Sequence, residues 1–139
     1  MKRWLVGILA VSLIWPWPAI ALDLQGLYEQ ALNASRSGDF VQALPLWDRV
    51  LEQSPQDAAA LSNRGNVRLA LGDLDGAIED QTLSIALAPE EADPHLNRGT
   101  AEEALQDWPA AAADYLWILE RQPDDASALY NLGNVRGSE

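Results

Sequence analysis

The chain of 139 residues lacks cysteine altogether and contains a single histidine, His95. Without cysteine it can form neither a disulfide framework nor a thiolate metal site, and it has no thiol nucleophile. One histidine cannot build a multi-histidine zinc site. Basic residues are also scarce, because 9 Lys and Arg stand against 21 Asp and Glu and the formal net charge is −12. Since nucleic-acid binding depends on Lys and Arg contacts with phosphates, this balance argues against a nucleic-acid partner.

The N-terminus has the three parts of a secretory signal. Two basic residues follow the initiator Met, an uncharged and, apart from Ser12, apolar run covers residues 4–15, and the tripeptide 19–21 (Ala-Ile-Ala) has the small-x-small pattern of a cleavage site. As a helix the run would be about 18 Å long, against about 30 Å for the hydrocarbon core of a bilayer. We therefore predict a signal peptide over 1–21 and an exported mature chain, starting at Leu22, with a net charge of −14. The alternative is an uncleaved segment that anchors the protein to a membrane.

A period of 34 residues runs through the rest of the chain. Its columns are Pro55, Pro89 and Pro123; Ala31, Gly65, Gly99 and Gly133; Ala43, Ala77 and Ala111; and Asp39, Asp73 and Asp107. An internal period of this length is the sequence signature of a repeat solenoid. Small residues let two helices approach closely, the aspartate caps the start of a helix, and the proline ends one. Each unit is therefore predicted to be two antiparallel helices joined by a tight turn.

The pattern predicts about seven helices and no strand. We place them at residues 24–37, 40–53, 58–71, 74–87, 94–105, 108–121 and 126–135. They form repeats at about 24–57, 58–91 and 92–125, with a partial fourth repeat at 126–139 in a domain that covers 22–139. Because the seventh helix resembles the first helix of another pair, we expect further repeats to follow it and Leu129, Leu132 and Val135 to be partly uncovered. The alternative is that this helix closes the solenoid.

These columns resemble the tetratricopeptide repeat (TPR) family over residues 24–137. The usual aromatic at the fourth repeat position is replaced by Leu27, Leu61, His95 and Leu129. The resemblance implies an all-α, right-handed superhelical solenoid of antiparallel helix pairs that acts as a protein-interaction scaffold and is not an enzyme. The stretches PHLNRGTAEEAL and DWPAAAADY look like exported cyanobacterial or chloroplast TPR proteins. This narrower resemblance implies the periplasm or the thylakoid lumen, and work in the assembly of a membrane complex.

No arrangement typical of catalysis accompanies the repeats. The nucleotide-binding, serine-hydrolase and zinc-protease motifs are absent from the sequence. The aspartates of the 34-residue column fall in turns, and the other acids are expected on a solvated face or at helix N-termini. His95 falls at a repeat core position, where we expect it to pack or to cap. We therefore predict no catalytic residue, no metal and no cofactor.

Polar residues at two repeat positions form the candidate site. They are Asn63, Asn97 and Asn131 at one position, and Asn66, Thr100 and Asn134 three residues later. Residues three apart share a helix face, and an amide offers both a donor and an acceptor to a peptide backbone. In the TPR family these positions line the concave groove, so the resemblance implies a row that binds an extended segment. The alternative is that these asparagines only cap or solvate their helices.

The nature of the bound segment follows from a second comparison. Chaperone-binding TPR domains hold a C-terminal carboxylate with Lys and Arg beside the asparagines. The corresponding positions here are Tyr28, Leu32, Asn63, Asp93 and Asn97, without a cation. We therefore expect a neutral or basic protein or peptide partner rather than an acidic one.

Two further expectations concern large residues and assembly. Trp47 and Tyr115 share a helix position and are predicted to be core, whereas Trp117 falls among solvated positions. An exposed Trp117 would suit an anchor at an interface, unless a neighbouring helix or Arg121 covers it. Instead of binding a peptide, the chain could serve as a structural module that self-associates through its open C-terminal face.

Overall fold

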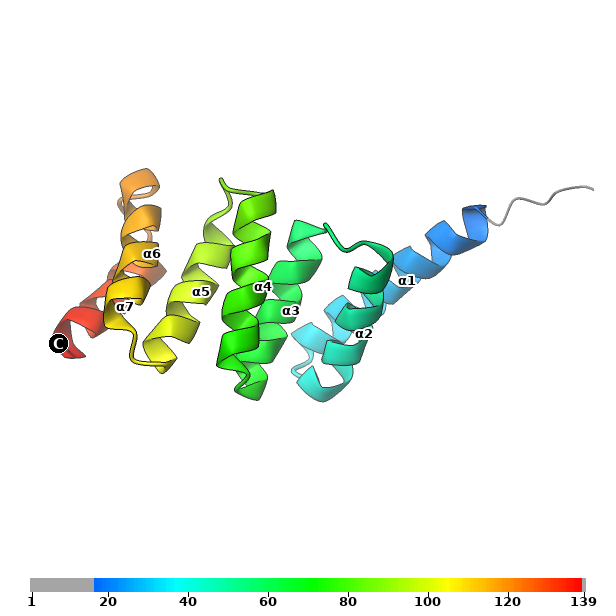
Figure 1. The fold of residues 1–139 in the computed structure, drawn as a ribbon, viewed down its shortest axis with the longest axis horizontal. Coiled ribbons are helices and arrows are strands. Elements are labelled where there is room, and N and C mark those ends of the chain that lie inside the picture. Colours follow the sequence, from blue (N-terminus) through cyan, green and yellow to red (C-terminus); the bar gives the residue numbers. More distant parts are fainter. Residues whose placement is uncertain (1–16, 139) are drawn as a thin grey trace, which may run out of the picture.

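The computed structural model describes residues 17–138, in which the chain folds into seven α-helices and no strand. The helices are α1 (Trp17–Arg36), α2 (Phe40–Gln53), α3 (Ala58–Leu71), α4 (Leu74–Leu87), α5 (Ala92–Ala104), α6 (Trp108–Arg121) and α7 (Ala126–Ser138). They follow one another along an elongated molecule from α1 at one end to α7 at the other (Figure 1). The all-α class and the helix number are confirmed, and four helices have the predicted bounds.

The first helix is longer than predicted. It begins at Trp17, so the predicted cleavage site after Ala21 lies within α1, whereas residues 1–16 of the predicted signal lie outside the described residues. Among the described helices, none combines the length and the apolar character needed to cross a membrane.

The turns inside the repeats are built as the 34-residue columns predict. In each turn an aspartate carboxylate accepts a hydrogen bond from the backbone N–H three residues later, at 3.1–3.3 Å. The residue before this aspartate has a left-handed backbone in all three turns: Gly38 (φ 78°), Gly72 (φ 83°) and Gln106 (φ 63°). Glycine adopts that region at little cost, so the substitution by Gln106 makes the third turn the strained one.

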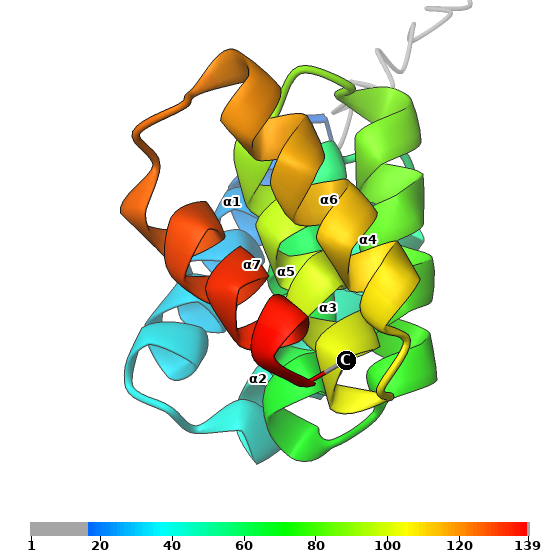
Figure 2. The ribbon, with the colours of Figure 1, turned by 90° about the vertical axis from the view of Figure 1, so that its left-hand side faces the viewer.

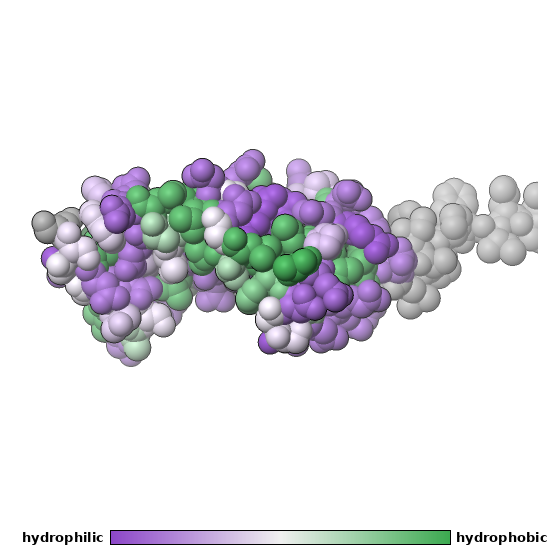
Figure 3. All heavy atoms as spheres, turned by 90° about the horizontal axis from the view of Figure 1, so that it is seen from below, coloured by the Kyte–Doolittle hydropathy of each residue, from purple (hydrophilic) through white to green (hydrophobic). Residues whose placement is uncertain are grey.

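The odd-numbered helices lie on the inner side of the curve. Each odd-numbered helix contacts the next odd-numbered one: α1 contacts α3, α3 contacts α5, and α5 contacts α7. Among the described residues, no two even-numbered helices are in contact. Helices on the inner side of a bend are brought closer together than those outside it. Seen from below, the outline of the molecule is hollowed between its two ends (Figure 3). The end view shows α7 and α1 on one side of the molecule and α4 on the other, with α6 crossing between them (Figure 2).

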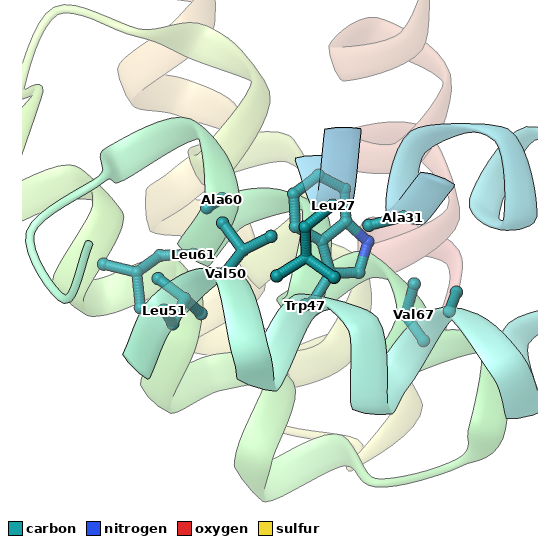
Figure 4. Packing of buried hydrophobic residues seen from close by; sticks show 9 residues of the cluster. Leu27, Ala31, Trp47, Val50, Leu51, Ala60, Leu61 and Val67 are labelled. Carbon is teal, nitrogen blue, oxygen red and sulfur yellow. The ribbon is translucent and has the colours of Figure 1, made fainter. Parts of the chain in front are cut away.

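Apolar packing is concentrated toward the two ends of the solenoid. In the first cluster, Trp47 is fully buried among Leu27, Ala31 and Val50 (Figure 4), and its Nε1 donates to Ser35 Oγ at 2.9 Å. The second cluster surrounds Tyr115 and Ile118 and joins α6 to α7. The prediction that Trp47 and Tyr115 are core residues is confirmed.

Leu129, Leu132 and Val135 of the last helix were expected to be partly uncovered, and this expectation is wrong for two of the three. Leu132 is 6% exposed and Val135 is fully buried, because α7 turns the face that carries them, with Ala128, onto the second cluster. Only Leu129 is open, at 50% exposed. Apolar residues three and four apart share one helix face, which is why Leu132 and Val135 are covered together.

Candidate functional site

The predicted polar row lies on three inner helices. Asn63 and Asn66 belong to α3, Asn97 and Thr100 to α5, and Asn131 and Asn134 to α7. Asn66 and Asn134 are exposed and the other four are partly buried, so each can be reached from solvent. Because α3 contacts α5 and α5 contacts α7, the three helices that carry these residues follow one another along the inner side of the solenoid.

A cleft of about 400 Å³ opens beside the first of these residues. It lies between α3, the end of α4 and the start of α5, and Asn63 lines it together with Ser62. Its apolar part comes from Ala58, Ala59, Ala88 and Pro94, and its charge comes from Glu91 and Asp93. Glu91 is the N-cap residue of α5 but makes no side-chain cap hydrogen bond. Two carboxylates thus remain available at the cleft.

The amide of Asn66 is held by a buried neighbour. Gln81 of α4 is almost fully buried, and its Nε2 donates to the backbone oxygen of Ser62 at 3.0 Å and to Asn66 Oδ1 at 3.1 Å. Because a backbone oxygen can only accept, the Gln81 amine must face Ser62. Asn66 therefore turns its oxygen to Gln81 and its Nδ2 donor to the exposed side.

The tyrosines next to the row respond to its amides. Burial raises the pKa of Tyr28, the charge of Asp57 raises it further, and a hydrogen bond with Asn63 lowers it. Burial raises the pKa of Tyr115 as well, Thr100 and Asn131 lower it, and Glu103, which accepts a hydrogen bond from the Tyr115 hydroxyl at 3.0 Å, raises it. Three row residues thus lie close to tyrosine hydroxyls.

Comparison with known sequences settles the family. Residues 28–92 and 96–136 match the tetratricopeptide repeat profile, which is most of the chain. The chain belongs to the tetratricopeptide repeat family. Tetratricopeptide repeat protein 36 of Danio rerio is 32% identical over 71 residues, which are 51% of this chain and 38% of the relative. The Bos taurus protein of the same name is 36% identical over 59 residues, which are 42% of this chain and 31% of the relative. The chain thus spans well under half of the length of both relatives.

Solved TPR domains have the same fold. The first TPR of Spaghetti (RPAP3), bound to the HSP90 peptide SRMEEVD, superimposes with a TM-score of 0.79 at 23% identity and covers 83% of this chain and 91% of that one. The Arabidopsis OM64 TPR domain gives 0.79 at 22% identity, over 84% of this chain and 96% of that one. At these identities the likeness establishes the solenoid fold.

Paired charges between the TPR helices are the main feature that the sequence analysis missed. Arg64 donates to Asp80 at 2.7 and 2.8 Å and to Asp48 at 2.9 Å. One repeat later, Arg98 donates to Asp114 at 2.7 and 2.8 Å and to Thr82 at 3.2 Å. Each arginine joins an inner helix to the outer helices of its own and the preceding repeat.

The burial of Asp80 and Asp114 corrects the expectation that acids outside the caps lie on a solvated face. The signal for these pairs was present, because Arg64 and Arg98, like Asp80 and Asp114, are separated by the same 34 residues. Charged residues that recur at a repeat period are usually solvated, so the period alone does not reveal that these pairs are buried.

His95 belongs to this network and confirms its expected packed position. Its Nδ1 lies 2.8 Å from Asp114 Oδ1, and it is buried. Burial and the charge of Asp114 raise the pKa of the nearby Glu102 to about 7, against the lowering effect of Arg98. A histidine–aspartate pair beside a carboxyl of this pKa has the elements of acid–base chemistry, but none of these groups lines the cleft at Asn63.

Trp117 is not the exposed anchor that the sequence suggested. It is only partly exposed, its ring stacks on the His95 ring with centroids 3.7 Å apart, and the Arg121 guanidinium lies 3.9 Å from its centroid. Two groups this close to one ring centre must occupy opposite faces. Cover by a neighbouring helix and by Arg121, the stated alternative, is the arrangement observed.

Proposed function

We propose that this TPR chain is a protein-interaction scaffold that binds an extended segment of a partner along the inner face of α3, α5 and α7. The observation that carries the proposal is the row of accessible amides on these helices, which begins beside the cleft at Asn63. Solved neighbours with peptides support it. They include the Spaghetti domain with its HSP90 peptide and the second TPR domain of human RPAP3 in complex with the HSP70 peptide SGPTIEEVD.

The proposed partner segment is neutral or basic. Both neighbouring peptides carry two glutamates near their ends and finish in aspartate. In this chain the cleft carries Glu91 and Asp93, and the whole chain has a net charge of −12. Like charges placed together across an interface repel, so an acidic tail is disfavoured and no nucleic acid is proposed as a partner.

The role we propose needs no catalytic residue, metal or cofactor. One fold neighbour, an O-GlcNAc transferase of Thermobaculum terrenum, is an enzyme, but the likeness covers 22% of that chain at 28% identity with a TM-score of 0.76. Support for a binding role comes from the site itself, because its accessible groups are amides and hydroxyls that can pair with a backbone.

Groove binding is tested by Asn63→Ala, Asn97→Ala and Asn131→Ala, singly and together. The partner is first isolated by a pull-down from the exported fraction of the cells that make the protein, and its bound segment is then titrated calorimetrically. Each lost hydrogen bond should weaken binding by about 0.5–1.5 kcal/mol, while helical content stays near that of the parent. Asn33→Ala removes an exposed amide from α1 outside the row and is the matched control. A triple variant that binds as tightly as the control would leave the asparagines as helix-solvating residues.

The same proposal includes export through the predicted signal to the periplasm or the thylakoid lumen. There the protein would take part in the assembly of a membrane complex. Sequencing the N-terminus of the protein from its native cells should find Leu22. Bulky replacements of Ala19 and Ala21 should leave the precursor uncut, because the peptidase accepts small side chains there. Recovery of unaltered protein that still begins at Met1 would favour the membrane-anchored alternative.

A specific observation also favours self-association as a second candidate. Gly65 and Gly99 are covered by Gln81 and Tyr115 of the following helix, whereas Gly133 at the same repeat position has nothing within 4 Å of an added Cβ. Leu129 on α7 is half exposed, although Leu27 and Leu61 at its repeat position are buried. Sedimentation of concentrated protein should show dimers that Leu129→Glu dissociates. A parent that stays monomeric would remove this candidate.

A further inference from the structure

The buried Gln81 has no counterpart in the neighbouring repeats. The residues 34 before and 34 after it are Trp47 and Tyr115, whose rings fill the space between their paired helices. Gln81 puts an amide there instead, against Gly65, and its Oε1 is buried without a hydrogen-bond partner among the described residues. A buried unpaired acceptor is unfavourable, so an apolar side chain at this position would be the more stable choice.

The arrangement around Gln81 fixes the polarity of Asn66. An isolated surface asparagine exchanges its oxygen and its amine by rotation, and therefore offers either a donor or an acceptor. Here the chain of bonds starts at the Ser62 backbone oxygen, which sets the direction of the Gln81 amide, and Gln81 in turn sets the direction of Asn66. The Oδ1 of Asn66 thus faces the buried Gln81, and its Nδ2 faces solvent on the inner helix α3, where Asn66 is exposed.

We propose that Gln81 is a positioning residue that makes Asn66 a dedicated hydrogen-bond donor in the groove. The second repeat then recognises an acceptor, namely a backbone carbonyl of the bound segment, and disfavours a backbone N–H at that point. Asn134 has the same repeat position on α7, and no hydrogen bond to its side chain is found within residues 17–138, so it serves as the unoriented comparison. This inference rests on the proposed function, which supplies the bound segment.

The orientation of Asn66 is tested first, in the free chain, by hydrogen exchange of side-chain amides in NMR spectra. The Gln81 amine protons should exchange slowly, because they are buried and bonded. Those of Asn66 should exchange as fast as those of Asn134. Slow exchange at Asn66 with fast exchange at Gln81 would overturn the inference, whatever the chain binds.

The proposed hydrogen bond from Asn66 to a backbone carbonyl of the bound segment is tested with a defined peptide. A decapeptide selected from a random display library on the chain is resynthesised with each amide bond replaced in turn by an ester, which weakens the carbonyl as an acceptor. One ester should weaken binding about three- to tenfold, as expected for one lost hydrogen bond. In the Asn66→Asp variant, which offers only acceptors at this position, that ester should cause no further loss of affinity. In the Asn134→Asp variant it should cause the full loss.

The Gln81→Met variant tests whether the Gln81 amide orients Asn66, because it keeps the side-chain volume and removes the amide. With Asn66 free to rotate, the penalty of the ester should shrink while the helical circular dichroism signal stays unchanged. A full ester penalty in Gln81→Met or in Asn66→Asp would overturn the inference. If no library peptide binds the groove, the proposed function fails instead, and the exchange measurement still decides the orientation of Asn66.

Discussion

Two aspartates that bind the same arginine should differ greatly in their effect on stability. Asp80 and Asp48 both lie within 2.9 Å of Arg64, but the Asp80 side chain is 1% exposed and that of Asp48 is 45% exposed. Asp80 also lies 3.1 Å from Arg68. Removing one partner of a buried pair leaves an uncompensated charge and costs about 3–5 kcal/mol. An exposed pair is worth about 0–1 kcal/mol, because water and salt replace the lost partner.

We therefore expect Asp80→Ala to lower the free energy of unfolding by about 3–5 kcal/mol and Asp48→Ala by about 1 kcal/mol or less. Urea unfolding followed by circular dichroism gives both values, provided that the slope against urea is the same in the two variants, since a changed slope signals loss of cooperativity. Repetition in high salt should reduce the small Asp48 effect further. Equal losses in the two variants would refute the reasoning that burial, rather than distance, decides the contribution of these pairs.

Three further outcomes follow from named contacts. Gly99→Ala should destabilise the chain by about 1–3 kcal/mol, because the new Cβ would lie 2.6 Å from the buried Tyr115 ring, whereas Gly133→Ala meets nothing and should be neutral or stabilising in thermal unfolding. Since the folded state keeps the proton of Glu102 up to a pKa of about 7 and the unfolded chain loses it near 4.5, the stability due to this group is complete below pH 4.5 and is lost as the pH rises to 7. Glu102→Gln should flatten that part of the pH profile of unfolding, and an unchanged profile would contradict the raised pKa. Leu129→Glu should leave the melting temperature close to that of the parent, because Leu129 is half exposed, and a collapse of the fold would show that it is covered.

The helix ends could be predicted because they are local. A left-handed residue followed by an aspartate cap sets where α2, α4 and α6 begin, and these three starts agree with the prediction. The start of α1 could not be placed in the same way. The sequence before Trp17 contains no Gly-Asp pair, and it has the pattern of a signal.

The polar row was predicted from the TPR resemblance, and its part in binding stays a prediction. Its six residues lie on the inner helices α3, α5 and α7, where the resemblance implies them. Periodicity could not reveal that Asn66 is oriented by Gln81, because that contact joins residues 15 apart on different helices and depends on the packing between them. The same holds for Trp117, which looks solvated in a helical pattern and is covered only because His95 of α5 stacks on it.

The central claim is that partners bind the inner face of this solenoid. Site-specific photo-crosslinking in the cells that make the protein tests it most directly, with a photoreactive residue placed at Asn97 on α5 or, as the matched control, at Val41, which is 75% exposed on the outer helix α2. Crosslinked products are identified by mass spectrometry down to the partner peptide. We expect one neutral or basic segment to be crosslinked from position 97 and to be absent from position 41. Crosslinks that form from position 41 and not from position 97 would contradict it.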